Sequence, residues 1–299
     1  MNDDRIAALL ALLAALQFGF GTQLTRLGLQ AVDSRSGTLI TIGASTAIYW
    51  LAAPWLLEPH YWTSSVVWLY VLIGLIRPAL SSNLAMAGTA RLGPTISSTL
   101  ASVAPFFGLL FGVLLLGEQV GLPLLFGTVA IVGGVIALAR RNSRRQPLVG
   151  EIDWPLWALC LPVLAALIRT IAQLVTKIGL EILPSPYFVG LVCYSTSFVV
   201  ALGMASVNRS ANVRRALRTP SSLWFVLTGV FYGGAVFTLN AALQFGPLSV
   251  VAPVVAAEPL FVLLFGSTIL RESNLNRRVV TAVLLIVLGV MVISARPSG

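Results

Sequence analysis

Apolar residues run along almost the whole chain in long stretches, separated by short polar connections. A helix needs about 20 apolar residues to cross a bilayer. Stretches of that length cover residues 6–29, 36–57, 66–90, 94–116, 120–139, 154–181, 184–206, 221–244, 247–270 and 278–295. The connections carry charges and turn-forming residues, as in "DSRSG", "EPHYWTSS" and "RRNSRRQP". The pattern predicts an all-α integral membrane protein with ten transmembrane helices.

Composition supports a membrane protein over a water-soluble one. Of the 299 residues, 57% are hydrophobic and only 10% are charged, whereas a soluble domain is about a quarter charged. The N-terminus "MNDDRIAALL" has two acids and no basic region before the first apolar stretch, so we expect this stretch to be a retained helix and not a cleaved signal. The net charge of +9 lies mostly on the connections, so it does not indicate nucleic acid as a partner.

The chain repeats itself. When Pro105–Glu118 is aligned with Pro259–Glu272, eight of fourteen residues are identical. The segment "LTRLGLQ" closes the first apolar stretch and "VTKIGLE" closes the sixth, and each half contains a Gly-Pro pair. Apolar composition favours chance matches at leucine, but not matches of proline, glycine and glutamate in one order. The alternative is a duplication retained only for packing.

The repeat divides the chain into a first five-helix repeat (1–142), a polar linker (143–153) and a second five-helix repeat (154–299). Because each half holds an odd number of spans, the two halves enter the membrane with opposite orientation. Inverted repeats are typical of secondary transporters, whose site lies near the midplane between the halves.

The segments "SVAPFFGLLFGVLLLGE" and "AAEPLFVLLFGSTILRE", with the five-plus-five repeat, resemble the drug/metabolite transporter superfamily and within it the EamA-type family. The resemblance covers essentially the whole chain. It implies gradient-driven export of small metabolites, commonly amino acids. The chain departs from the family in its first span, "LQFGFG", where Trp-Gly is expected, and in "LRE" at the end of the second motif. EamA-type sequences usually carry Glu at the position of Glu258, which also allows a structural role there.

Three ionisable residues lie in the middle of apolar stretches: Arg77, Arg169 and Glu258. A charge at that depth costs a few kcal/mol in lipid, so each is expected to face a wet cavity or a partner. Arg77 is followed by Pro78, and Glu258 by Pro259. Proline breaks a helical hydrogen bond, which is tolerated where the backbone lines a cavity. The alternative is an internal Arg–Glu pair that only locks helices together.

Polar residues follow these charges at helical spacing. Ser81 stands four residues after Arg77, Gln173 four after Arg169, and Asn240 and Gln244 are also four apart. The candidate substrate-binding residues are Arg77, Ser81, Asn83, Arg169, Gln173, Asn240, Gln244 and Glu258. Glu258 is in addition the candidate coupling residue.

The sequence offers little for catalysis. It has no Walker A pattern, so intrinsic ATP hydrolysis is not expected. The single histidine, His60, stands in a polar connection, and Cys160 and Cys193 lack metal-ligand spacing. We therefore expect no enzyme activity, no cofactor and no metal site.

We expect a secondary active transporter in a bacterial-type inner membrane that moves a small polar metabolite by alternating access. The expected substrate has an anionic group and is first of all an amino acid, with a proton as possible coupling ion. The alternatives are a phosphorylated or lipid-linked substrate, or a non-transporting scaffold or receptor. A four-helix type of multidrug exporter is disfavoured, because residues 6–25 hold no glutamate.

Basic residues lie mainly on one side of the predicted membrane. The odd-numbered connections carry Arg26, Arg35, Arg91, Arg140, Arg141, Arg144, Arg145, Arg209, Arg214, Arg215, Arg218, Arg271, Arg277 and Arg278. The other side carries Arg5, Lys177 and Arg296. Because cytoplasmic loops are enriched in Lys and Arg, this bias predicts non-cytoplasmic termini. Familiar members of the EamA-type family are usually drawn the other way round.

Overall fold

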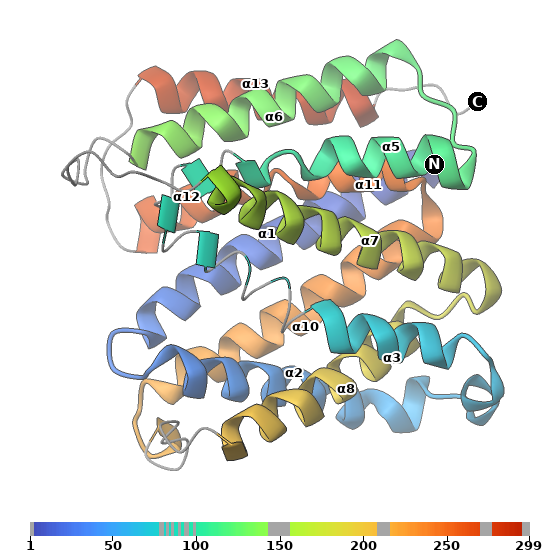
Figure 1. Cartoon of the computed structure of the whole chain (residues 1–299), viewed down its shortest axis with the longest axis vertical. Helices are drawn as coiled ribbons and strands as arrows, with labels where there is room; N and C mark the ends of the chain where they lie inside the picture. Colours follow the sequence, from blue (N-terminus) through green and yellow to red (C-terminus); the bar gives the residue numbers. More distant parts are fainter. Residues whose placement is uncertain are drawn as a thin grey trace.

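The computed structural model describes residues 3–77, 81, 84, 87–88, 91–92, 96–97, 100–142, 156–207, 216–269 and 277–294. In the first half the helices are α1 (Asp3–Gly28), α2 (Ser34–Leu56), the 3-10 helix η1 (Pro59–Thr63), α3 (Val67–Ile76), α5 (Ala104–Leu116) and α6 (Leu122–Asn142). In the second half they are η4 (Leu156–Leu159), α7 (Cys160–Ile182), α8 (Pro186–Val207), α10 (Ser222–Phe245), α11 (Leu248–Val255), α12 (Glu258–Ile269) and α13 (Arg277–Ser294). No described residue lies in a β-strand, which confirms the all-α fold (Figure 1).

Six helical segments are long and apolar enough to cross a membrane. They are Asp3–Gly28, Ser34–Leu56, Trp157–Ile182, Pro186–Ser206, Ser222–Phe245 and Leu248–Thr268. Shorter apolar helices are Val67–Ile76, Ala104–Leu116, Leu122–Ala137 and Val280–Ser294. Each of these segments overlaps one predicted stretch. These lengths and compositions agree with the predicted membrane protein, while ten full crossings stay a prediction.

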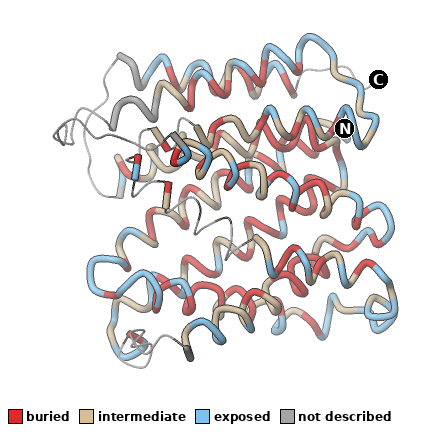
Figure 2. The backbone as a smooth tube through the Cα atoms, in the orientation of Figure 1, coloured by how far each residue is buried: buried red, intermediate tan, exposed pale blue. Residues whose placement is uncertain are grey.

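The outward faces of the helices suit a lipid environment. Figure 2 shows buried residues gathered between the helices and exposed ones on their outer faces. Large apolar side chains are among the exposed ones, and Trp55 is 82% and Trp68 76% accessible. They flank the connection 57–66, which contains Trp62. The ring of Trp62 lies 5.1 Å from that of Phe188, just after the end of α7, whereas the exposed Trp157 stands just before the start of α7 and so at the other end of the bundle. Tryptophan at both ends is typical of the two membrane–water interfaces.

A helix break occurs where Pro259 predicts one. The stretch Leu248–Thr268 is continuous in hydropathy but forms two helices, α11 and α12, with a turn at Ala256 and Ala257. Proline has no amide hydrogen, so Pro259 cannot continue the ladder, and the backbone tightens instead, with Ala257 N donating to Val254 O at 3.1 Å. Glu258 is consequently the first residue of α12.

Contacts between the halves come in equivalent pairs. Helix α2 packs on α10 in the same way as α8 packs on α3. Ser45 Oγ donates to Gly229 O at 2.7 Å, and Ser197 Oγ donates to Gly74 O at 2.9 Å. One turn earlier, Thr41 Oγ1 donates to Phe225 O at 3.3 Å.

The equivalent of that Thr41 contact is present in the other half. Cys193 Sγ donates to Tyr70 O at 3.3 Å, and Cys193 stands four residues before Ser197, as Thr41 stands four before Ser45. Exchanging the two halves reproduces these contacts, as expected for two repeats related by a two-fold axis.

The two acceptor glycines allow this close helix approach, and alanine at either site is expected to destabilise the protein. A Cβ on Gly229 would lie 2.5 Å from the carbonyl oxygen of Thr41, and one on Gly74 would lie 2.7 Å from that of Cys193. Gly229→Ala and Gly74→Ala should each cost about 1–3 kcal/mol through overpacking. Their melting temperatures in detergent measure this cost.

Gly203→Ala is the matched control, because a Cβ there meets no atom within 4 Å. Equal melting temperatures for all three alanine variants would contradict the close packing.

Candidate functional site

A cavity of about 610 Å³ lies between the two halves. Helices α1, α2, α3, α7, α8, α10, α11 and α12 all contribute to its wall. It reaches from mid-bundle to the end where α1 finishes and α2 begins, since Leu29, Ser34 and Thr38 are among its lining residues. None of the described residues that line it comes from the connections at the opposite end of the bundle. The cavity therefore extends toward one side of the bundle only.

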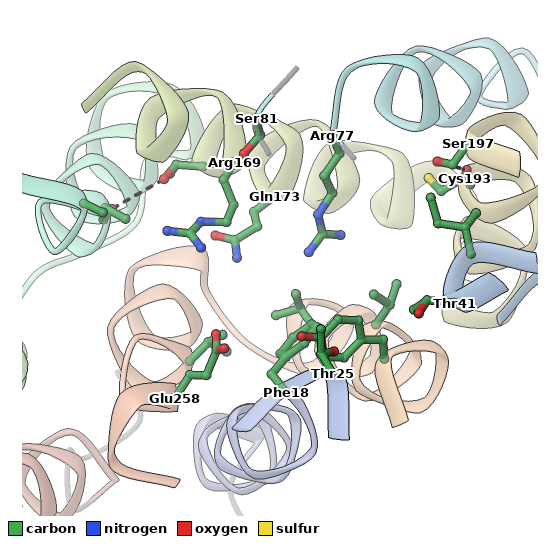
Figure 3. A pocket seen from close by; sticks show the side chains of 18 of the residues that line it. Phe18, Thr25, Thr41, Arg77, Ser81, Arg169, Gln173, Cys193, Ser197 and Glu258 are labelled. Carbon is green, nitrogen blue, oxygen red and sulfur yellow. Dashed lines mark hydrogen bonds between the residues drawn. The ribbon is translucent and has the colours of Figure 1, made fainter. Parts of the chain in front are cut away.

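The wall made by α3 and α7 is basic. Arg77, at the end of α3, and Arg169 and Gln173, on α7, point into the cavity in Figure 3. Arg169 is exposed although it lies well inside α7, because its side chain opens onto the cavity. Gln173 is 8% exposed. Among the described residues, neither guanidinium nor the Gln173 amide has a hydrogen-bond or ion-pair partner. These donors are free to bind a solute.

The opposite wall combines a carboxylate with aromatic and hydroxyl groups. Thr22 Oγ1 lies 3.4 Å from Glu258 Oε1, to which it donates, and 3.1 Å from the hydroxyl oxygen of Tyr232. The rings of Phe18 and Tyr232 are 5.7 Å apart. No arginine of the described chain lies within 4.0 Å of the Glu258 carboxylate. The locking Arg–Glu pair considered from the sequence is thus not formed in this structure.

One helix end favours the charge found at it. Glu258 opens α12, where the helix dipole is positive and stabilises an anion. Broken helices whose ends point at a midplane site are characteristic of secondary transporters. Pro259, next to Glu258, indicated this break. Pro78, which follows Arg77, lies outside the described residues.

The repeat places unlike residues at equivalent positions in the cavity. Tyr232 stands three residues after Gly229, as Arg77 stands three after Gly74. By the shared Thr-basic-x-Gly-Leu motif, the α1 residue equivalent to Arg169 is Phe18. Glu258, which precedes the aligned proline of the second half, corresponds to an alanine in the first. The helices of the two halves are thus arranged symmetrically, but the side chains that they present to the cavity differ in charge and polarity.

Sequence reasoning missed Thr22 and Tyr232, because uncharged residues in an apolar helix cost too little to stand out. An alignment of the two repeats would have found both residues. Tyr232 is the equivalent of Arg77. Thr22 is the equivalent of Gln173, because each stands three residues before the threonine of the Thr-basic-x-Gly-Leu motif.

The far end of the bundle is closed by Glu118. Its Oε1 accepts from Leu248 N at 2.6 Å and its Oε2 from Ser249 N at 2.8 Å, which caps the N-terminus of α11 in the other half. The preceding Gly117 has φ of 66°, a left-handed conformation that glycine adopts without strain. The "LGE" motif thus forms a turn and a cap that joins the two halves.

Lys177 closes the same end from α7. Its Nζ donates to Leu243 O at 2.8 Å and to Gly246 O at 3.1 Å, at the C-terminal end of α10. Cations at a helix C-terminus are favourable because they meet unpaired carbonyls and the negative end of the dipole.

The structure brings only some of the sequence-predicted site residues together. Those that line the cavity between the halves are Arg77, Ser81, Arg169, Gln173 and Glu258.

Asn240 and Gln244 do not belong to that lining. Asn240 Nδ2 donates to Pro186 O at 3.3 Å and Gln244 Nε2 to Pro184 O at 3.2 Å, both at the closed end. Asn83 lies outside the described residues.

Titratable groups outside the helices have local partners. Asp33, the N-cap of α2 beside the cavity mouth, accepts from Ser36 N at 2.9 Å, and this bond holds the pKa of its carboxyl below the usual value. His60 Nδ1 lies 3.2 Å from Glu58 in the exposed η1 connection. The described residues contain no cluster of three potential metal ligands.

Two comparisons with known proteins agree with this geometry. The family model described as the EamA-like transporter family matches residues 5–140 and 156–295, once in each half. One solved crystal structure superposes with a TM-score of 0.77 at 18% identity, covering 96% of this chain and 95% of its own. At that identity the likeness shows the fold alone. No curated protein matches the chain.

Proposed function

This chain belongs to the EamA-like transporter family, and we propose that it carries a small polar metabolite with an anionic group across the membrane by alternating access. The family assignment confirms the resemblance found in the sequence and makes the chain a multi-pass membrane transporter of small molecules. An amino acid is the first candidate for the substrate, and a bacterial-type inner membrane is the proposed location.

One observation carries the proposal for the substrate. Two guanidinium groups and a buried amide on one wall of the cavity lack protein partners, while a carboxylate stands on the other wall. Donors that face a cavity without a protein partner can bind a solute, and hydrogen bonds to charged groups are the strong ones, so this wall is suited to a bound anion. Arg77 or Arg169 would hold the substrate carboxylate, with Gln173 beside it.

Alternating access follows from the repeat and from the one-sided cavity. In this state the contacts of Glu118 and Lys177 close one end, and the cavity reaches the other. A rocking motion of two inverted five-helix repeats would exchange the open and closed ends around a fixed site.

Counterflow in proteoliposomes tests the function. Liposomes loaded with a metabolite mixture and containing the purified chain should accumulate a labelled substrate from outside. Arg77→Gln combined with Arg169→Gln should abolish this accumulation. If no solute of a broad mixture exchanges although the protein is folded, a scaffold or receptor becomes the better interpretation.

Glu258→Gln is expected to separate the two roles proposed for this carboxylate. If Glu258 carries a coupling proton, the glutamine variant should lose the pH dependence of transport while still exchanging substrate. If it holds the substrate ammonium, the variant should keep the pH dependence and lose selectivity for amines. A variant with unchanged pH profile and unchanged selectivity would remove Glu258 from both roles.

The orientation in the membrane is proposed from charge. The cavity reaches the side bearing the basic connections, which the positive-inside rule places in the cytoplasm. Alkaline phosphatase fused after Gly299 should be active, and a cytoplasm-active reporter within Asn142–Arg145 should also be active. The reverse pair of results would place the termini inside.

A further inference from the structure

The charges that line the cavity indicate how many acidic groups the substrate carries. The ionisable residues among its described lining, tyrosines and the buried cysteine aside, are Arg77, Arg169 and Glu258. With all three charged they sum to one positive charge. A zwitterion adds none, so an occupied cavity would keep an unneutralised cation at the middle of the membrane, where charge is expensive.

We infer that the substrate is a small amine with two acidic groups and a net charge of −1. This inference rests on the proposed function and assigns the chemistry of the same cavity. Each arginine binds one acidic group, and the Glu258 carboxylate binds the ammonium. The occupied cavity is then neutral, which allows the bundle to close around it.

The donor geometry supports two acidic groups. A guanidinium presents five N–H donors in a fork that matches a carboxylate or a phosphate. The two forks come from different helices, α3 for Arg77 and α7 for Arg169, and neither has a protein partner among the described residues. The Gln173 amide, 8% exposed and likewise unpartnered, points into the same space (Figure 3).

The unlike residues at equivalent positions fix the orientation of this substrate. The position equivalent to Arg77 in the second repeat holds Tyr232, and the position equivalent to Arg169 in the first repeat holds Phe18. The centroids of these two rings are 5.7 Å apart. An apolar carbon chain is suited to this aromatic surface. The acidic groups then face α3 and α7, and the ammonium faces Glu258 at the start of α12.

Four matched probes test the charge class: L-glutamate, L-glutamine, glutarate and L-homocysteate, whose second acidic group is a sulfonate. In counterflow with the wild-type chain, L-glutamate or L-homocysteate, which both carry a net charge of −1, should exchange about tenfold faster than L-glutamine, which lacks the second acidic group. Glutarate, which lacks the ammonium, should also be slow. The faster of the two acidic amines tells whether the second group is a carboxylate or a sulfonate.

Arg77→Gln supplies the decisive variant. It lowers the cavity charge by one, so it should lose about tenfold in exchange of the acidic amine and gain exchange of L-glutamine. Arg77→Lys keeps the charge and should keep the preference for the acidic amine, which guards against a folding defect in the glutamine variant.

If the wild-type chain exchanges L-glutamine at least as fast as both acidic amines, the proposed substrate charge of −1 is wrong, although the chain is still a transporter. An equal loss of all probes in Arg77→Gln, with the lysine variant active, overturns that charge too. Absence of exchange for every solute of a broad mixture overturns the transport function itself.

Discussion

Replacing Arg169 with glutamine is expected to weaken binding of a carboxylate substrate by about tenfold to a hundredfold, which corresponds to about 1.5–3 kcal/mol for a hydrogen bond to a charged group. The decarboxylated analogue should bind nearly as before, because it makes no contact with the guanidinium. The effect should exceed that of a surface pair, since Arg169 faces a cavity enclosed by helices where water screens charge less. Equilibrium binding of both compounds to the detergent-solubilised protein measures the difference.

Two further variants give this measurement its controls. Arg5→Gln removes an exposed arginine at the start of α1, outside the cavity lining, and should change neither binding nor melting temperature. If Arg169 only packs against Glu258, then Arg169→Gln should lower the melting temperature, and Arg169→Gln with Glu258→Gln should restore it. Recovery of both stability and transport in that double variant would show that these are not substrate residues.

Loss of the Glu118 carboxylate is expected to open the closed end of the bundle. Glu118→Ala leaves the amides of Leu248 and Ser249 without their acceptor and removes an anion from the α11 N-terminus. Each hydrogen bond to a charged group is worth about 1.5–3 kcal/mol, so the closed end should lose about 3 kcal/mol or more. Glu118→Gln keeps one acceptor oxygen and should lose about half as much.

Hydrogen–deuterium exchange at α11 provides the readout, with faster exchange expected near residue 248 in Glu118→Ala. Glu181→Ala is the matched control, because Glu181 is exposed and makes no hydrogen bond or ion pair with any described residue. Unchanged exchange at α11 in Glu118→Ala would show that the cap contributes little to the closure.

The fold was largely predictable, because a membrane helix is recognised in a sequence by its length and its apolar residues. An unpaired backbone N–H or C=O group is costly in lipid, so an apolar stretch of about 20 residues has few alternatives to a helix. The break between α11 and α12 was also predictable, since Pro259 removes a hydrogen bond at a defined place. The ten crossings rest on sequence where the described helices are short, as for α3 and α5.

The candidate site was predictable only in its charged part. Arg77, Arg169 and Glu258 attracted notice because a buried charge is costly, and all three line the cavity. Asn240 and Gln244 have the same helical spacing as Arg169 and Gln173, yet they bond to carbonyls at the closed end. Spacing gives the face of a helix, but the packing of neighbouring helices decides what that face meets.

The role of Glu118 could not be read from the repeat. Its identity with Glu272 marked it as part of a motif, but the partner amides lie about 130 residues away, and only the folded chain brings them together. Lys177 was likewise visible as a polar residue in an apolar stretch, without any sign that its partners are the last carbonyls of α10.

The Cys193 thiol, which donates to Tyr70 O, offers a chemical label for the open and closed states of the cavity. Cys193 is buried in the cavity wall, while Cys160, the other cysteine, is exposed at the start of α7. A Cys160→Ser variant would therefore carry one thiol, within reach of the cavity. The rate at which a membrane-impermeant maleimide alkylates Cys193 would then follow the fraction of molecules in which this thiol has left Tyr70 O and faces a cavity open to water, and a bound substrate would slow it.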